Sequence, residues 1–281
     1  MKSNNDIPWA QLQRYRFIEW QLLWGQQLKA KMLTHTFGVS RYQAGLDIKG
    51  YVTLCPENVR PYNPADRCYK PELNFTPRFA SQNPTEFIES MNGGLPGHMP
   101  INVVPVLQRV ISLGIMPAVM AAIEGRYRIE TLYASASTPI GGKRVLCPIS
   151  LVYVANRFHV RAFCETRGEY RDFVLSRFLH SPKVLSDESF DNLPIDGEWE
   201  TEVLVKLKAN PKLGLDGCDL ISREYDLINN NSVKLRKALV HYYLQANLLP
   251  HNEEQRTISM EKPWAFPVII DNWKEVSALL F

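Results

Sequence analysis

Residues 157–177 have the sequence RFHVRAFCETRGEYRDFVLSR. Basic and apolar residues alternate from Arg157 to Ala162, which predicts a strand with one cationic face and one core face. The turn-forming residues 165–169 and a second alternating run after them predict the partner strand. This stretch therefore indicates a β-hairpin.

Pairing two such strands would bring guanidinium groups and an imidazole close together, because the second strand also carries basic residues, Arg171 and Arg177. Like charges at such distances cost stability, so an incoming anion would offset them. The alternative is that these arginines are separate surface charges paired with Glu165, Glu169 and Asp172.

The composition is that of a globular protein with room for two or three domains, since 45% of its 281 residues are hydrophobic and 22% are charged. No signal-peptide pattern or membrane-spanning apolar run is found, so we expect a cytoplasmic protein. The five cysteines and six histidines lack metal-site or disulfide spacing. We therefore expect no metal and no cofactor.

The net charge of +3 conceals an uneven distribution. Residues 1–80 carry 11 Lys and Arg against 6 Asp and Glu, and residues 125–182 carry 9 against 4. Residues 183–281 carry 11 against 16, and residues 81–124 carry 1 against 3. Two basic blocks followed by an acidic tail favour polyanionic partners.

The first third of the chain predicts a helix-turn-helix. Helical apolar spacing predicts helices over about residues 8–24 and 28–35. A glycine turn at Gly38 follows, and then Ser40 and Gln43 form a capping-box pattern that begins a third helix. A small helical domain used for protein contacts is the alternative interpretation.

The third helix presents outward the side chains that a major-groove reader needs: Arg41, Tyr42, Gln43 and Lys49. Gly45 costs about 1 kcal/mol relative to alanine in a helix, and it either lets the backbone lie close to DNA or is simply tolerated. A proline-edged hairpin over residues 58–70 would then form a wing. Its cations would meet phosphates and not bases; they are Arg60, Arg67 and Lys70.

Residues 75–100 predict a linker with one short helix near residues 86–91. Residues 102–124 predict one long helix or two shorter ones broken near Pro117. Such a connector would carry motion between domains or would serve packing and dimer formation, and both alternatives stay open.

Short strands are predicted over residues 128–137, 143–148 and 149–154, with a turn at Gly141-Gly142, which indicates a small, strongly bent antiparallel sheet or barrel. The first strand supplies neutral hydrogen-bonding groups: Tyr133, Ser135 and Ser137. A hydrolase triad of Ser135 with His159 and Asp172 is disfavoured, because no G-x-S-x-G elbow or glycine-rich oxyanion loop lies nearby. We therefore expect that this protein is not an enzyme.

The last third predicts a separate small α+β unit. ETEVLVKLKAN predicts a strand, residues 211–219 a loop, and residues 233–248 an amphipathic helix. A valine-isoleucine run to Ile270 and a short final helix complete the unit.

Separated motifs in this chain resemble the WYL-domain transcriptional regulators of the CapW and BrxR type, which control bacterial phage-defence operons. The motifs are RYRFIEWQLLWGQQL, FGVSRYQAGLDIKGY, LYASAS, RFHVRAFCE and YRDFVLSRF. The resemblance implies an α+β fold of four parts. These are a winged helix-turn-helix (1–80), a linker with connector helices (81–124), a WYL domain with an Sm-like β-barrel (125–182) and a C-terminal WCX domain (195–281).

In this family the winged helix-turn-helix binds double-stranded operator DNA as a homodimer. The DNA-binding residues implied here are Ser40, Arg41, Tyr42, Gln43, Lys49, Arg60, Arg67 and Lys70. The ligand-binding residues implied in the WYL pocket are Tyr133, Ser135, Ser137, His159, Arg161, Arg171 and Arg177. The ligand implied is a nucleic-acid-derived anion, such as a short single strand or a cyclic oligonucleotide.

Two positions depart from the family pattern. Phe158-His159-Val160 replaces the tripeptide that names the WYL domain, and Gly45 stands where the family often has a side chain able to contact DNA. The leading hypothesis is a dimeric repressor of a defence operon. The alternatives are a ligand-gated activator and a single-strand or RNA-binding accessory protein.

Overall fold

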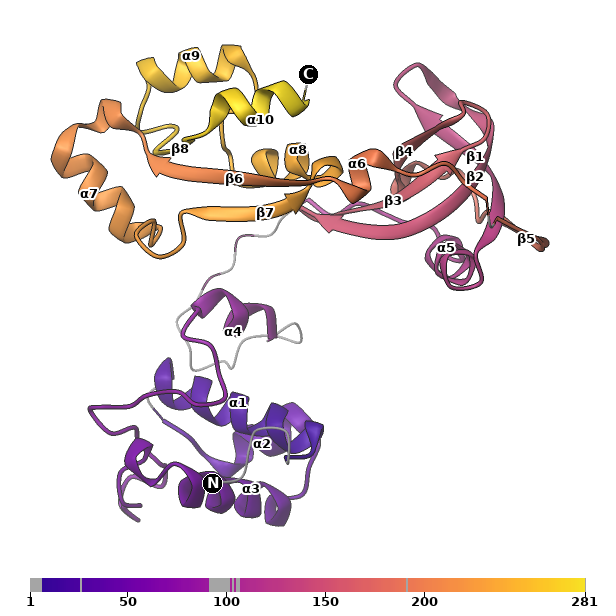
Figure 1. The fold of residues 1–281 in the computed structure, drawn as a ribbon. Helices are drawn as coiled ribbons and strands as arrows, with labels where there is room; N and C mark the ends of the chain where they lie inside the picture. The colour runs from indigo at the N-terminus through magenta and orange to yellow at the C-terminus, as the bar shows by residue number, and fades with distance from the viewer. Residues whose placement is uncertain are drawn as a thin grey trace. The chain divides into compact units, whose positions relative to one another are not determined.

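The computed structural model describes residues 7–25, 27–90, 102, 104, 107–190 and 192–280. It divides into two compact units, Met1–Val104 and Pro105–Phe281, each with its own apolar packing (Figure 1). No helix among these residues is long and apolar enough to cross a membrane.

Three helices form the core of the N-terminal unit: α1 (Trp9–Leu23), α2 (Ala30–Phe37) and α3 (Arg41–Leu54). Gly38 takes the left-handed conformation (φ 66°) that ends α2. Ser40 Oγ then accepts the Gln43 N–H at 3.1 Å and caps α3. The predicted helices, turn and cap are confirmed.

The predicted wing is also present, as an irregular hairpin after the 3₁₀ turn η2 (Pro56–Asn58). Val59 pairs with Pro71 and Asn63 pairs with Cys68 in isolated antiparallel bridges. Leu28, ahead of α2, pairs with Tyr69 and attaches the wing to the helices.

Buried Glu19 of α1 holds the segment that leaves this unit. Its carboxylate accepts the backbone N–H groups of Arg78, Phe79 and Ala80 at 2.6–2.9 Å and the Tyr51 hydroxyl at 3.0 Å. The short helix predicted next is found as α4 (Pro84–Ser90). The rest of the predicted linker, residues 91–101, lies outside the described residues.

Both alternatives predicted for residues 102–124, one long helix or two helices broken near Pro117, are wrong for the described part of the connector. Residues 107–112 are not helical, and a single helix, α5 (Ile115–Glu124), begins after Gly114. Pro117 lies in the first turn, where its missing N–H removes no intrahelical hydrogen bond. The buried side chains Ile115, Val119 and Ala122 pack α5 onto the sheet that follows.

The central sheet is antiparallel, with strand order β4-β3-β2-β1-β5, and it curves strongly (Figure 1). Its strands are β1 (Tyr127–Ser135), β2 (Thr138–Val154), β3 (Arg157–Cys164), β4 (Glu169–Val174) and β5 (Lys183–Ser189). The bent sheet and the β3–β4 hairpin are confirmed. Among the described residues, the edge strands β4 and β5 form no ladder with each other.

Two local predictions in this sheet are wrong. Gly141-Gly142 is not a turn, because β2 runs through it and the chain reverses between the paired Ser135 and Thr138. Residues 143–154 are one strand, with an irregularity in its pairing to β3 between Pro148 and Ser150, and an irregularity of this kind is where a strand tolerates proline.

The second half of the predicted hairpin also ends earlier than expected. Leu175 and Arg177 lie in the 3₁₀ turn η3 (Leu175–Arg177) and not on β4. Arg171 faces Ala162 across the ladder, whereas Arg161 faces Asp172. The hairpin therefore opposes Arg161 with an acid and does not place it beside Arg171.

The C-terminal part is a three-stranded sheet of order β7-β6-β8 covered by helices (Figure 1). Its strands are β6 (Glu202–Ala209), β7 (Ser232–Arg236) and β8 (Val268–Ile270). Its helical elements are α6 (Gly197–Glu200), η4 (Pro211–Leu213), α7 (Gly214–Glu224), α8 (Lys237–Ala246), α9 (Glu253–Glu261) and α10 (Trp273–Leu280).

The small α+β unit, its first strand and its final helix are confirmed, and two assignments within it are wrong. The predicted loop at residues 211–219 contains η4 and the start of α7, which packs Ile221 into the core. The predicted helix at residues 233–248 divides into β7 and α8, because residues 233–236 pair with β6.

Candidate functional site

One face of α3 is exposed. Residues 41, 45 and 49, together with 42 and 46, recur at every fourth position and so share one side of the helix. The members of this exposed face are Arg41, Tyr42, Gly45, Leu46 and Lys49. The opposite side is buried through Ala44, Asp47, Ile48 and Tyr51.

Gln43 does not lie on the exposed face. Its Nε2 donates to Asp47 Oδ2 at 3.2 Å, one turn along the helix. Asp47 is fully buried and also binds Arg14 of α1, with Arg14 Nε donating to Oδ2 at 2.6 Å. Gln43 is therefore partly committed to attaching α3 to α1.

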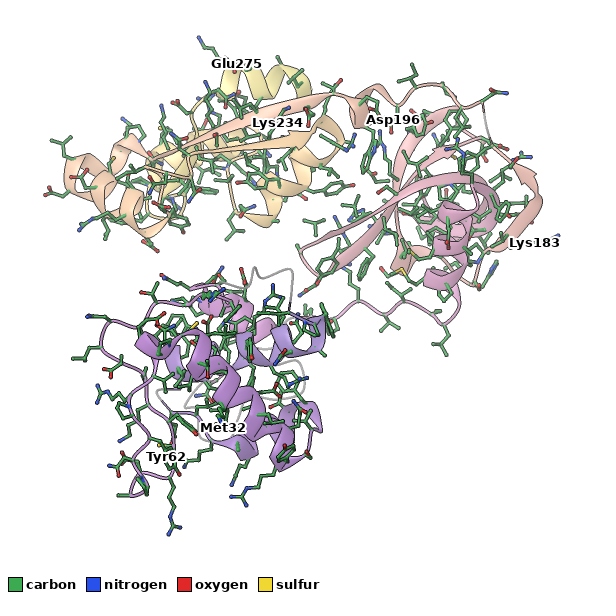
Figure 2. All side chains as sticks on the ribbon, turned by 60° about the horizontal axis from the view of Figure 1, so that its bottom comes forward. Met32, Tyr62, Lys183, Asp196, Lys234 and Glu275 are labelled. Atoms are coloured by element: carbon green, nitrogen blue, oxygen red, sulfur yellow. The ribbon has the colours of Figure 1, made fainter. Side chains whose placement is uncertain are left out.

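A basic groove lies between α2, the start of α3 and the wing. It has a volume of about 440 Å³ and brings Arg41 and Arg67 together with Lys29 and Lys31. Tyr62 of the wing also lines it, and its ring is tilted by 47° to that of Tyr69, with centroids 4.9 Å apart; Figure 2 labels Tyr62. Four cations at one groove suit a phosphate backbone.

The other predicted DNA-binding residues lie around this groove or the helix. Lys70 forms an ion pair with Asp66 at 3.1 Å, and Arg60 lies 3.9 Å from Glu72. These pairs are about half exposed, so a competing phosphate can replace the carboxylates at little cost. Ser40 contributes the helix cap.

The sequence reasoning missed Lys29, Lys31 and Leu46. The two lysines flank the start of α2, and only the folded wing reveals that they share a groove with Arg41. Leu46 was missed because an apolar residue in a helix is normally assigned to the core, yet 45% of its surface is exposed.

In the Pro105–Phe281 unit, His159 occupies a buried and electropositive position on β3. Its Nε2 accepts a hydrogen bond from Arg157 Nε at 2.7 Å, and its ring lies 4.6 Å from that of Tyr242 on α8. Burial, followed by the charges of Arg157, Arg177 and Arg109, lowers the pKa of His159 to about 4. The imidazole is therefore neutral at pH 7, and its buried Nδ1 has no partner among the described residues.

The charges of three guanidinium groups act on this imidazole: Arg157, whose Nε lies 2.7 Å from Nε2, and then Arg177 and Arg109. Across the described part of the chain, none of the three forms an ion pair with a carboxylate. Together with His159 they form what we call the cationic cluster. An anion placed among them would relieve their repulsion, which is the property expected of the hairpin.

Arg161 has a different environment from the one expected. It is 3% exposed and binds Asp196 through Nε at 2.7 Å and NH2 at 2.8 Å, with Asp172 and Glu198 at 3.4 and 3.2 Å. Burial alone would lower its pKa, but the bonds and charges of Asp196 and Asp172 raise the pKa above its ordinary value. The alternative interpretation is correct in pairing an arginine with Asp172, but Arg161 is buried and not a surface charge, and its nearest partner is Asp196.

These carboxylates join the central sheet to the C-terminal part. Asp196 caps α6 by accepting the Trp199 N–H, and Asp172 of β4 accepts the Tyr242 hydroxyl of α8 at 3.1 Å (Figure 2 labels Asp196). Arg161 therefore acts as a buried clamp between the two parts of this unit.

The remaining predicted pocket residues are not gathered at the cationic cluster by any described contact. Arg171 pairs with Glu169 at 2.6 Å on the exposed edge strand. Ser135 and Ser137 bond each other at 3.1 Å beside the β1–β2 turn. The Tyr133 hydroxyl is buried and accepts the Val174 N–H.

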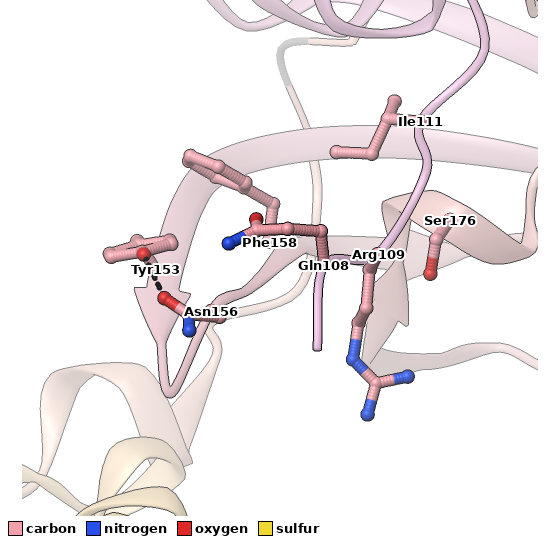
Figure 3. A pocket seen from close by; sticks show the side chains of 7 residues that line it. All are labelled: Gln108, Arg109, Ile111, Tyr153, Asn156, Phe158 and Ser176. Atoms are coloured by element: carbon pink, nitrogen blue, oxygen red, sulfur yellow. Dashed lines mark hydrogen bonds between the residues drawn. The ribbon is translucent and has the colours of Figure 1, made fainter. Parts of the chain in front are cut away.

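Beside the cationic cluster a hollow of about 120 Å³ opens at the β2–β3 turn (Figure 3). Arg109 of the connector and Ser176 of η3 are among the residues that line it. Its lining residues are Gln108, Arg109, Ile111, Tyr153, Asn156, Phe158 and Ser176. The sequence reasoning missed Arg109, although it is the sole lysine or arginine of segment 81–124.

Neither metal nor hydrolase chemistry finds support in this geometry. Within the described ranges no three His, Cys, Asp or Glu side chains are placed to hold a metal ion. Ser135 bonds Ser137 and the Thr138 N–H, and His159 bonds Arg157, so the weighed Ser–His–Asp arrangement does not form.

Models of three domain families match the chain: the BrxR transcriptional regulator winged helix-turn-helix domain (residues 10–93), the WYL domain (114–182) and the BrxR transcriptional regulator C-terminal dimerization domain (202–276). A DNA-binding transcriptional repressor CapW of Escherichia coli is 33% identical, over 99% of this chain and 95% of its own length. The chain belongs to the BrxR/CapW-type WYL transcriptional regulators.

CapW repressors of two further organisms are similar over nearly their whole length. The Pseudomonas aeruginosa protein is 31% identical over 99% of this chain and 95% of its own. The Stenotrophomonas maltophilia protein is 26% identical over 98% and 93%. Membership of the BrxR/CapW type confirms the resemblance seen in the sequence and the expectation of a regulator and not an enzyme.

The clamp and the edge-strand ion pair give a matched stability test. Arg161→Met leaves buried Asp196 and Asp172 without their cation, so we expect a loss of about 3–5 kcal/mol in the free energy of unfolding. Arg171→Met removes a half-exposed pair and should cost less than about 1 kcal/mol. Urea unfolding of both variants measures this, and equal losses would contradict the clamp.

The lowered pKa of His159 predicts an acid-sensitive unit. Because the imidazole pKa is about 4 when folded against 6.5 otherwise, the unfolded chain binds more protons in this window. The free energy of unfolding should therefore fall between pH 6.5 and pH 4, by at most about 3 kcal/mol from this residue.

His159→Gln should flatten this pH dependence, whereas His180→Gln, at an exposed position, should leave it unchanged. The pKa of His241 is also lowered, by burial and then by His251, so the comparison is made between variants and not on the wild-type curve alone. Chemical unfolding at several pH values provides the measurement. Parallel curves for wild type and His159→Gln would argue against a neutral buried imidazole.

Proposed function

We propose that this chain is a DNA-binding transcriptional repressor that contacts operator DNA through the exposed face of α3 and the wing. The observation that carries the proposal is the basic groove, where Lys29, Lys31, Arg41 and Arg67 meet beside an uncovered helix face. The similarity to the CapW repressors supports the same activity. Ser40, Tyr42, Lys49, Arg60 and Lys70 complete the proposed interface.

We also propose a homodimer formed through residues 202–276, the part that matches a dimerization domain. Two copies of the winged helix-turn-helix would then contact two half-sites, so the operator should be a pseudo-palindrome. The regulated genes would be those of a phage-defence operon, as the resemblance implies. A ligand-gated activator would use the same residues, and a reporter assay distinguishes the sign of regulation.

The sensing half of the proposal rests on the cationic cluster. His159 and Arg177 of the expected pocket, with Arg157 and Arg109, would receive a phosphate-bearing anion derived from nucleic acid. Arg161 would hold the clamp beneath this site, and Tyr133, Ser135, Ser137 and Arg171 would contribute only if the bent sheet closes as an Sm-like barrel. Arg109 lies on the connector, so an anion bound there would bear directly on the segment leading to the DNA-binding unit.

For such an anion to act as a switch, it must bind the form that does not bind DNA more tightly. The same coupling makes DNA weaken the binding of the anion. A site built from unpaired cations suits this requirement, because its affinity depends on how closely the connector brings Arg109 to the other two guanidinium groups.

Operator binding is tested with the full chain and the DNA upstream of its gene, by fluorescence anisotropy against a scrambled duplex. We expect sequence-specific binding whose affinity falls steeply with salt. Arg67→Ala should lower the slope of log K against log salt by about 1. Lys212→Ala, an exposed cation in the other unit, is the charge-matched control.

Equal affinity for the upstream and scrambled duplexes would reject the repressor. Retention of nucleic-acid binding by residues 105–281 alone, with a preference for single strands, would instead favour the RNA-binding alternative.

Sensing is tested with 5′-phosphorylated dinucleotides and a cyclic dinucleotide as probes. They should weaken operator binding by the wild type and raise the pKa of His159, which a histidine NMR titration detects. Arg157→Ala/Arg177→Ala should bind the operator normally but lose the response. A response that survives in this variant would place the sensor elsewhere.

A further inference from the structure

Gly45 lies at the centre of the exposed face of α3, and no contact with the described residues accounts for it. A Cβ added there would meet no atom of those residues within 4 Å, and its φ is not in the left-handed region. Gly50 of the same helix has an internal reason, since a Cβ there would come 2.6 Å from the Tyr15 hydroxyl. Because glycine weakens a helix interior relative to alanine, Gly45 lowers stability without any internal gain.

Leu46 is the second unusual residue on this face. It is 45% exposed beside Gly45, while Arg41 and Lys49 on the same face are exposed cations. No acidic side chain lies on the exposed face, since Asp47 is buried. The face thus combines a flat apolar centre with positive ends, which complements the major groove of duplex DNA.

We propose that Gly45 and Leu46 form an apolar contact for the 5-methyl group of thymine in the major groove. The inference rests on the proposed function and specifies how the operator is chosen. Gly45 lets the α3 backbone approach the base edges, and Leu46 packs on the methyl group, the feature that marks thymine in this groove. Arg41 and Lys49 supply the polar and phosphate contacts on either side.

The hydrogen bond from Gln43 to Asp47 restricts how Gln43, a residue expected to contact bases, can reach DNA. A carboxylate only accepts hydrogen bonds, so one of the two N–H groups of the Gln43 amide faces Asp47, which fixes the direction of the amide. Bidentate recognition of adenine needs both the amide nitrogen and the amide oxygen to face the base. Gln43 is therefore restricted in how it meets a base, whereas the exposed face, with Gly45 and Leu46 at its centre, has no such restriction.

The test uses the full chain and a duplex selected by the wild type from a random-sequence pool. Each thymine is replaced in turn by deoxyuridine, which removes only the methyl group. We expect at least one replacement to weaken wild-type binding by about fourfold, the effect of one buried methyl. Leu46→Ala should bind the parent duplex more weakly and be insensitive to that replacement, while Leu73→Ala, also exposed in this unit, should behave as wild type.

Gly45→Ala tests the close approach separately. The melting temperature should rise, because alanine favours the helix, yet specific binding should weaken by roughly tenfold or more, as for a mismatched base pair. Because this variant is expected to be more stable, weaker binding cannot be attributed to misfolding. Operator affinity equal to that of wild type would show that the glycine is only tolerated and would overturn its role.

The outcomes separate this inference from the proposed function. If every thymine can be replaced without loss and Leu46→Ala binds as wild type, the methyl contact is overturned while sequence-specific repression stands. If the selection returns no consensus sequence, operator recognition itself is rejected and the methyl contact falls with it.

Discussion

The ion pair between Arg14 of α1 and Asp47 of α3 is the interaction on which the DNA-binding unit depends. Asp47 is fully buried and Arg14 Nε lies 2.6 Å from it, so the pair is removed from water and sensitive to geometry. A buried pair of this kind contributes orientation more than net stability. It sets the rotation of α3, and that rotation decides which side chains face outward: Arg41, Tyr42, Leu46 and Lys49 do, whereas Gln43 leans toward α1.

In the second unit, arginines that are paired with carboxylates and arginines that are not have different roles. Arg161 is enclosed by Asp196, Asp172 and Glu198 and clamps the central sheet to the C-terminal part. The charges of Arg157, Arg177 and Arg109 act instead on the neutral imidazole of His159. Arg161 and its carboxylates fix how the two parts pack together. The other three arginines are positioned by that packing, and their charges are not neutralised by a described carboxylate. The proposed anion sensing depends on both groups of arginines.

Local patterns in the sequence predicted the helix-turn-helix, the Ser40 cap, the wing and the β3–β4 hairpin, because each depends on neighbouring residues. The partners of buried charged side chains could not be predicted from local patterns, because they come from distant parts of the sequence. Arg161 alternates with apolar residues like any exposed strand cation, and only the fold brings Asp196 to it, 35 positions away. Residues 233–236 looked helical until β6 supplied a ladder, and Gly141-Gly142 looked like a turn although β2 passes through it.

The central claim is that duplex DNA lies on α3 and the wing. Hydrogen exchange of the full chain, with and without the selected duplex, tests it most directly because it locates the contact along the chain. The account predicts slower amide exchange over residues 41–49 and 60–70, with the protection lost at high salt. Protection confined to the central sheet, residues 127–189, would contradict it.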